Sequence, residues 1–288
     1  MERSKLNINA GIFAITTASL LVLLKLYAWI QTDSLSIFSS LIDSSLDVAT
    51  SVINLLAIGY ALKPADEDHP YGHDSIEDIV GLLQAAFISG SGFFILYEGL
   101  QRFYRPTEVM RNDLGINVMI FSVLITIALV TYQKIVVART KSIVVESDSV
   151  HYVSDILSGI LIIISLFITR NSALSFIDPL LAIIIAAYIS ATAYKIGKRA
   201  FDNLMNKEID EKDKNKIIDI ITANKNHNGF HQLKTRSSGT KIFIQFDLEL
   251  DGELTLRQAH DISDEVMHAI MREYPNSEVI IHFDPERD

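Results

Sequence analysis

The chain has 288 residues, a net charge of −10, a hydrophobic content of 49% and no cysteine. The missing thiols exclude a disulfide framework and a thiolate metal site, and the acidic balance argues against nucleic acid and for cations as partners. Because the apolar residues come in long blocks instead of being spread evenly, the composition is typical of a membrane protein.

Six apolar blocks are each long enough to cross a lipid bilayer as a helix of about 20 residues. The first is longer than the core of a secretory signal and lacks a cleavage site of small residues, so we expect it to stay in the mature protein. Residues 1–203 are therefore predicted to form an all-α, six-helix transmembrane domain. The blocks cover residues 9–30, 34–62, 77–100, 113–137, 142–169 and 176–197.

Lysine and arginine residues near the ends of the blocks predict the orientation, because cytoplasmic loops carry an excess of them. One side of the membrane is clearly richer in these residues, so we expect both termini to be cytoplasmic. The richer side carries Arg3, Lys5, Lys63, Lys134, Arg139, Lys141, Lys195, Lys198 and Arg199, and the other carries Arg102, Arg105, Arg111 and Arg170.

The second block carries Asp43 and Asp47, which lie four residues apart and so share one face of a helix. Ionisable groups at bilayer depth are rare unless they face a cavity or a partner. The fifth block supplies a matching pair, His151 and Asp155. One imidazole and three carboxylates suit a divalent transition metal, Zn²⁺ first, because zinc accepts nitrogen and oxygen ligands in a tetrahedral shell. We interpret the four residues as the site of a transported ion.

Asp148 lies three residues before His151, on a neighbouring face of the same helix. It could orient the imidazole, as metal-bound histidines usually require, or it could be a charge at the start of the helix. Both interpretations agree with the spacing.

The connection after the second block is crowded with metal-ligand types. Asp66, His69 and His73 are spaced by three and four residues, which suits one local metal site. Two prolines and a glycine in the same stretch exclude a continuous helix. The alternative is a solvated loop whose histidines only titrate.

Beyond Phe201 the pattern changes to that of a small soluble α+β domain, residues 204–288, with helices on one face of a sheet. In residues 241–250 apolar and polar residues alternate, which predicts a strand with one solvated face. The expected elements are a helix at 210–223, strands at 231–237 and 241–250, a helix at 255–274 and a strand at 278–283.

The same domain holds histidines and carboxylates that could form a cytoplasmic metal cluster. His282 and Asp284 are two residues apart on a strand and so share a face. Asp247 lies on the polar face of another strand, His260 lies on the helix between the strands, and His231 is another histidine of the domain. Scattered surface histidines are the alternative.

The chain contains no GxxxxGK phosphate loop, so we expect no nucleotide and a transport process driven by an ion gradient. Metal ligands must be deprotonated before they bind, so protonation can expel the ion, and a histidine ligand places part of that exchange near neutral pH. We therefore predict metal/proton antiport by alternating access. An intramembrane metalloenzyme would need HExxH or a comparable base, and no histidine here precedes a glutamate. A membrane-anchored metal sensor would need no intramembrane carboxylates.

Three motifs carry a resemblance to a known family: Asp43-Ser-Ser-Leu-Asp47, Asp66-Glu-Asp-His-Pro-Tyr-Gly-His73 and His151-Tyr-Val-Ser-Asp155, in this order. The resemblance extends to the C-terminus through two further segments, Phe-Ile-Gln-Phe-Asp-Leu-Glu-Leu and Val-Ile-Ile-His-Phe-Asp-Pro. With these motifs the chain resembles the cation diffusion facilitator family, and specifically its bacterial zinc and ferrous-iron efflux branch.

The resemblance implies a secondary active transporter, not an enzyme, that exports Zn²⁺ across the bacterial inner membrane, with Fe²⁺, Cd²⁺ and Co²⁺ as other cargoes. It implies a homodimer whose metallochaperone-like (ferredoxin-like) tail pairs across the two-fold axis. It also implies three sites: a transport site of Asp43, Asp47, His151 and Asp155, a loop site of Asp66, His69 and His73, and a two-metal tail site that includes His231, His260, His282 and Asp284.

Three positions depart from the pattern of the branch. Asp247 replaces a usual histidine and could still bind zinc through oxygen. Ser75 stands where a lysine is usual, and Asn206 where an aspartate is usual. The charge interlock that the last two positions make in relatives therefore cannot form here.

Overall fold

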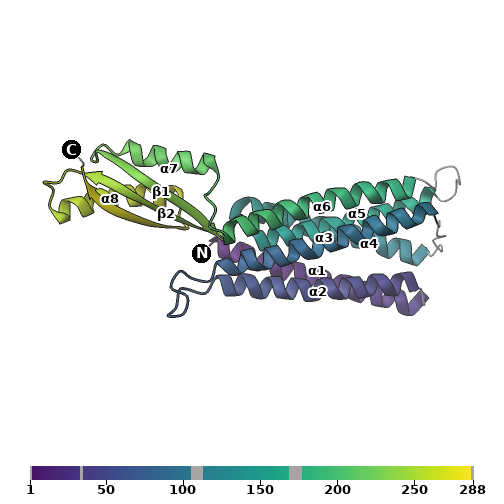
Figure 1. Ribbon diagram of the computed structural model, residues 1–288. Helices are drawn as coiled ribbons and strands as arrows, with labels where there is room; N and C mark the ends of the chain where they lie inside the picture. Colours follow the sequence, from purple (N-terminus) through teal and green to yellow (C-terminus); the bar gives the residue numbers. More distant parts are fainter. Residues whose placement is uncertain (1, 33–34, 105–112, 169–176, 287–288) are drawn as a thin grey trace. The chain divides into compact units, whose positions relative to one another are not determined.

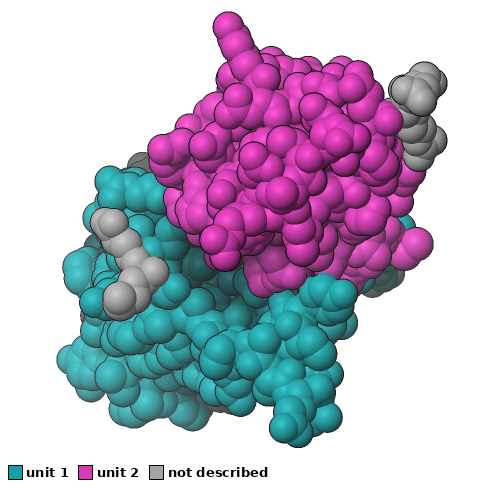
Figure 2. Space-filling view, turned by 90° about the vertical axis from the view of Figure 1, so that its left-hand side faces the viewer, with its two compact units in different colours: residues 1–201 teal, residues 202–288 magenta. Residues whose placement is uncertain are grey.

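The computed structural model describes residues 2–32, 35–104, 113–168 and 177–286. They form two compact units, Met1–Phe201 and Asp202–Asp288, which Figure 2 colours separately. The boundary lies two residues before the one expected from composition.

Long helices make up most of the described part of the first unit (Figure 1). Four of them are long and apolar enough to cross a membrane within the described residues: Arg3–Gln31, Ser40–Ala61, Ser75–Tyr97 and Ile116–Thr140. The other two predicted spans adjoin residues 169–176, which lie outside the described part. The helices are α1 (Glu2–Thr32), α2 (Leu35–Ala61), α3 (Ser75–Tyr104), α4 (Asp113–Thr140), α5 (Ile143–Ile168) and α6 (Ile177–Leu204).

Helix α5 contacts α2, α3 and α4, and α1 packs along α2 and α4. Helices α3 and α6 approach closely because small residues line their contact: a Cβ added to Gly92 would lie 2.6 Å from Ser190 Oγ, and one on Gly197 would lie 3.1 Å from Ala85 Cβ. Close approach through small residues is a common way to pack helices in membranes. Helix α5 packs against α3 and α4, which carry the buried polar side chains Gln84 and Gln133.

The second unit is a three-stranded sheet with two helices, as the sequence predicts (Figure 1). The strand order is β1-β2-β3, with β1 antiparallel and β3 parallel to β2. Chain reversal between β1 and β2 uses Gly239, whose φ of +53° lies in the left-handed region that glycine adopts readily. The elements are α7 (Glu211–Ala223), β1 (Gly229–Ser238), β2 (Lys241–Leu250), α8 (Leu256–Glu273) and β3 (Ser277–Pro285).

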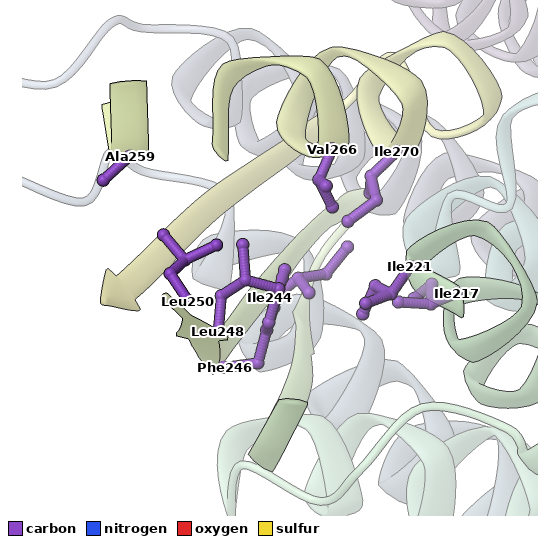
Figure 3. Close-up of a cluster of buried hydrophobic side chains, with 9 residues drawn as sticks. All are labelled: Ile217, Ile221, Ile244, Phe246, Leu248, Leu250, Ala259, Val266 and Ile270. Atoms are coloured by element: carbon purple, nitrogen blue, oxygen red, sulfur yellow. The ribbon is translucent and has the colours of Figure 1, made fainter. Parts of the chain in front are cut away.

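The core of this unit lies between one face of the sheet and the two helices (Figure 3). Its members on β2 are every second residue, so the predicted alternation is confirmed. Helix α8 begins with a capping box in which Thr255 and Gln258 bond each other's backbone N–H groups. The buried cluster consists of Ile217, Ile221, Ile244, Phe246, Leu248, Leu250, Ala259, Val266 and Ile270.

Replacing Phe246 with alanine should destabilise this unit by about 3–5 kcal/mol, because the ring is fully buried and its removal leaves a cavity. Hydrogen exchange of the β2 amides in the full-length protein would measure the loss. Ile280→Ala is the matched control, since that side chain on β3 is 50% exposed and its removal should cost less than about 1 kcal/mol. Equal effects at the two positions would contradict the assigned core.

Candidate metal centres

The first cluster lies between α2 and α5, two of the helices predicted to cross the membrane. His151 Nε2 lies 2.9 Å from Asp47 Oδ1 and 3.9 Å from Asp155 Oδ2. Ligand atoms of all three residues lie within 4.8 Å of one another. We refer to Asp47, His151 and Asp155 as the transmembrane cluster.

The donor set of the transmembrane cluster fits a divalent cation. The side chains of Asp47 and His151 are 14% and 13% exposed, and Asp155 Oδ2 is buried without a hydrogen-bond partner among the described residues. Tetrahedral zinc holds its ligand atoms roughly 3.3 Å apart, given bonds of about 2.0 Å, so the three groups are already near the required spacing. A buried acceptor without a partner is costly, and a bound cation would supply one.

Asp43, the fourth predicted ligand, lies outside this cluster. Its side chain is exposed, whereas Asp47 is partly buried against α5. Four residues along a helix correspond to about 6 Å of rise and about 40° of rotation, which places Asp43 one turn farther from His151. Beside it, the Lys25 ammonium from α1 donates to Ser44 Oγ at 2.6 Å.

Sequence reasoning missed a layer of buried amides next to the transmembrane cluster. Asp148, which was expected either to orient His151 or to start a helix, instead accepts bonds from Asn54 Nδ2 at 2.8 Å and from Gln133 Nε2 at 2.6 Å. Asn54 accepts from Gln84, which accepts from Ser147. We call these five residues the amide layer. Three amide side chains within apolar blocks were the signal that could have found it.

The second cluster is the loop between α2 and α3. Asp66 Oδ1 lies 3.2 Å from His69 Nδ1, and Asp66 Oδ2 lies 3.3 Å from His73 Nε2. His73 is buried edge-on against the Tyr60 ring, and its Nδ1 has no hydrogen-bond partner within the described chain. All three predicted residues therefore converge, and two histidines with a carboxylate suit zinc.

The loop should stay ordered at lower pH than an ordinary aspartate would allow. The His69 backbone N–H, which donates to Asp66 Oδ1 at 2.7 Å, lowers the pKa of the Asp66 carboxyl, and the His69 side chain adds to this. Because the pKa of the Asp66 carboxyl is lower in the folded loop than in the unfolded chain, its ionised form stabilises the loop above the unfolded pKa, which is about 4. This stabilisation is lost as the pH falls through the lower pKa of the folded state. The chemical shift of the His69 amide should therefore titrate below about pH 4. In Asp66→Asn this titration should vanish, and its persistence would contradict the assignment.

The third cluster lies on the face of the tail sheet opposite its helices. His231 Nε2 lies 3.2 Å from Asp284 Oδ2 and 3.6 Å from Asp247 Oδ2. The strand register brings them together, because His231 pairs with Asp247 and Glu249 pairs with Asp284. Glu249, which was not predicted, lies 3.1 Å from His231 Nδ1. Two carboxylates and an imidazole fit a divalent metal at Nε2, with Glu249 beside the other ring nitrogen.

Two predicted tail residues lie outside this cluster. His260 is exposed on α8, which packs against the opposite face of the sheet, so it does not reach His231 within one chain. Its Nε2 lies 3.6 Å from Asp264 instead. His282 is 66% exposed, and its Nε2 lies 3.3 Å from Asp284 Oδ1. The sheet therefore gathers three of the five predicted residues closely.

Two family models cover nearly the whole chain: the cation efflux transmembrane domain matches residues 11–205, and the cation efflux protein cytoplasmic domain matches residues 209–286. Protein p34 of Rickettsia rickettsii is 40% identical over 99% of this chain and 94% of its own length. The cation-efflux pump FieF of Citrobacter koseri is 40% identical over 96% of this chain and 92% of its own length.

Among solved structures, the tail is similar to a chain described as the putative zinc transporter CzrB. The identity is 26%, the TM-score is 0.27, and the match covers 27% of this chain and 99% of that one. The two family models together with the 40% identical relatives place the sequence in a known group of integral membrane transporters. The chain belongs to the cation diffusion facilitator, or cation efflux, family.

Proposed function

We propose that the protein exports divalent metal cations, Zn²⁺ first, from the cytoplasm in exchange for protons. The observation that carries this proposal is the convergence of Asp47, His151 and Asp155 from two long apolar helices. Membership of the cation efflux family supports export, as does the name of the Citrobacter relative, a cation-efflux pump. The protein is a secondary active transporter and not an enzyme.

The exchange with protons follows from the chemistry of the ligands. A carboxylate or imidazole that binds a metal must first lose its proton, so metal and protons compete for the same atoms. Access from the cytoplasm would load the ion, and access from the outside would let protons displace it. We place both termini on the cytoplasmic side of the inner membrane, on the basis of the lysine and arginine distribution.

A homodimer is the proposed assembly, and the match of residues 209–286 to a family model named for dimerisation supports it. The loop cluster and the tail cluster would then be additional Zn²⁺ sites. Their residues fit a metal because the ligand atoms of each cluster lie within 4.8 Å of one another, and in the loop cluster His73 Nδ1 is buried without a hydrogen-bond partner within the described chain. When bound, the ion would link ligands that otherwise only contact one another.

Reconstituted vesicles test the proposal directly. Zn²⁺, Fe²⁺, Cd²⁺ and Co²⁺ are offered in turn to vesicles that contain one dye for metal and one for pH, with Mg²⁺ as the control ion. Zn²⁺ flux coupled to opposite proton flux, and increased by an imposed pH gradient, is the expected result. Metal binding without flux would instead indicate a membrane-anchored sensor and would overturn the proposal.

A further inference from the structure

The amide layer surrounds one carboxylate that the transmembrane cluster does not use. Asp148 is 4% exposed, and each of its two oxygens accepts one amide N–H, from Asn54 on α2 and from Gln133 on α4. Protonation would place an O–H group against a donor that already occupies that oxygen. The hydrogen-bond pattern therefore suits the ionised form of Asp148.

Hydrogen bonding alone does not explain a carboxylate at this position. Gln133 Oε1 is buried without a partner within the described chain. If Asp148 were an asparagine, the Gln133 amide could turn, accept its N–H and leave the bond from Asn54 intact. That neutral arrangement would avoid the cost of burying a charge, which is several kcal/mol per ion. The feature that distinguishes Asp148 from its neutral isostere is its negative charge.

The charge lies close to the transmembrane cluster. Asp148 precedes His151 by three residues, a spacing that puts Cβ atoms about 5–6 Å apart on a helix. Three contacts in register join α2 to α5: Asn54 with Asp148, Ser51 with Tyr152 at 2.9 Å, and Asp47 with His151. The Asp148 carboxylate also interacts electrostatically with the imidazole of His151.

We propose that Asp148 is a specificity-determining residue of the transport site, a fixed anion that raises the affinity for a divalent cation without binding the ion. Asp47 and Asp155 with a neutral His151 supply two negative charges, which match one divalent ion. The positive charge of the Lys25 ammonium on α1 opposes these two negative charges. The negative charge of Asp148 compensates for that of Lys25. Since Coulomb energy scales with the charge of the ion, a divalent cation gains twice as much as a monovalent one. The proposal rests on the proposed function.

The test is Zn²⁺ transport by Asp148→Asn in vesicles, with KM and maximal rate measured separately. We expect KM to rise about tenfold, which is about 1.4 kcal/mol of binding free energy, with the maximal rate within about threefold of wild type. A residue needed only for folding would lower the amount of active protein and leave KM unchanged. Tyr152→Phe is the matched control: it removes a hydrogen bond from the same interface without changing charge, and its KM should stay within about twofold.

The double variant Asn54→Asp with Asp148→Asn moves the carboxylate from α5 to α2, to the other side of the 2.8 Å hydrogen bond between these two positions. Every hydrogen bond of the amide layer can still form. The double variant should return KM to within about threefold of wild type. If Asp148→Asn does not fold, Gln133→Ala serves instead, because it removes one bond to Asp148 and keeps the charge. Its KM should remain within about threefold of wild type, and a tenfold rise would overturn the proposal.

Wild-type KM in folded Asp148→Asn, or a raised KM that the double variant does not restore, would also overturn it. Failure of the proposed function is distinguishable, since in that case the wild-type protein itself would move no metal.

Discussion

Replacing Asp47 with asparagine is expected to reduce Zn²⁺ transport at least about 100-fold while the protein remains folded. Asparagine keeps the size of the side chain and removes its charge and one of its acceptor oxygens. The transmembrane cluster would lose one of its two carboxylates, the one that lies 2.9 Å from His151 Nε2. Loss of a group that merely orients a metal ligand costs about 10–100-fold, and loss of a ligand should cost at least as much. Initial rates of metal uptake in vesicles measure the effect.

Two further aspartate variants make that result interpretable. Asp219→Asn changes an exposed carboxylate on α7, far along the chain from the cluster, and should leave transport unchanged. Asp43→Asn tests the fourth predicted ligand. A loss of transport as large as that of Asp47→Asn would show that Asp43 joins the coordination shell of the bound ion. Full activity in Asp47→Asn would remove the transmembrane cluster from the transport path.

Replacing His151 with aspartate is expected to change which ion is carried. The transmembrane cluster would then offer only oxygen ligands, which Mg²⁺ and Mn²⁺ prefer, whereas an imidazole favours zinc. We expect the KM for Zn²⁺ to rise about 100-fold and the ratio of Mn²⁺ to Zn²⁺ transport to increase by at least as much. Competition between the two ions in vesicles loaded with metal-sensitive dye measures this ratio.

His151→Gln is the control for the selectivity experiment, because it removes the imidazole without adding a charge. Because its amide oxygen replaces the imidazole nitrogen, the preference for Zn²⁺ over Mn²⁺ should fall here as well, whereas both ions should bind more weakly than in His151→Asp because no charge is added. If His151→Asp left the order unchanged, the imidazole would have no role in ion selection.

The tail could be predicted almost completely from the sequence, because its signals are local. The alternation of Ile244, Phe246 and Leu248 with polar residues defines both the strand and its buried face. The helix over 255–274 was predicted within a residue at each end, since Thr255 and Gln258 form its capping box. Such patterns depend on neighbours in the chain and need no knowledge of the tertiary contacts.

The metal clusters could be predicted only in part, because ligand spacing gives the face of an element and not what that face meets. Asp43 and Asp47 do lie one turn apart, but the crossing of α2 and α5 brings only Asp47 to His151. His260 lies on the predicted helix, yet that helix covers the other face of the sheet. The rotation and packing of whole elements decide these outcomes.

The amide layer shows a different limit. Asn54, Gln84 and Gln133 are single polar residues within long apolar blocks. Each side chain could equally have formed its hydrogen bonds with the backbone of its own helix. Only their placement on three helices reveals that Asn54 and Gln133 both donate to Asp148 and that Gln84 donates to Asn54. The pattern in each block is too sparse to predict a contact between blocks.

The strand register of the tail predicts how long its ion would remain bound. His231, Asp247 and Asp284 lie on adjacent strands whose backbones are hydrogen-bonded, so the distances between their backbones can grow only if the ladder opens. Asp47 and His151 sit on two helices joined by side-chain contacts, which can slide apart in microseconds to milliseconds. An ion in the tail should therefore dissociate slowly and outlast many turnovers, while the cargo leaves with each helix movement.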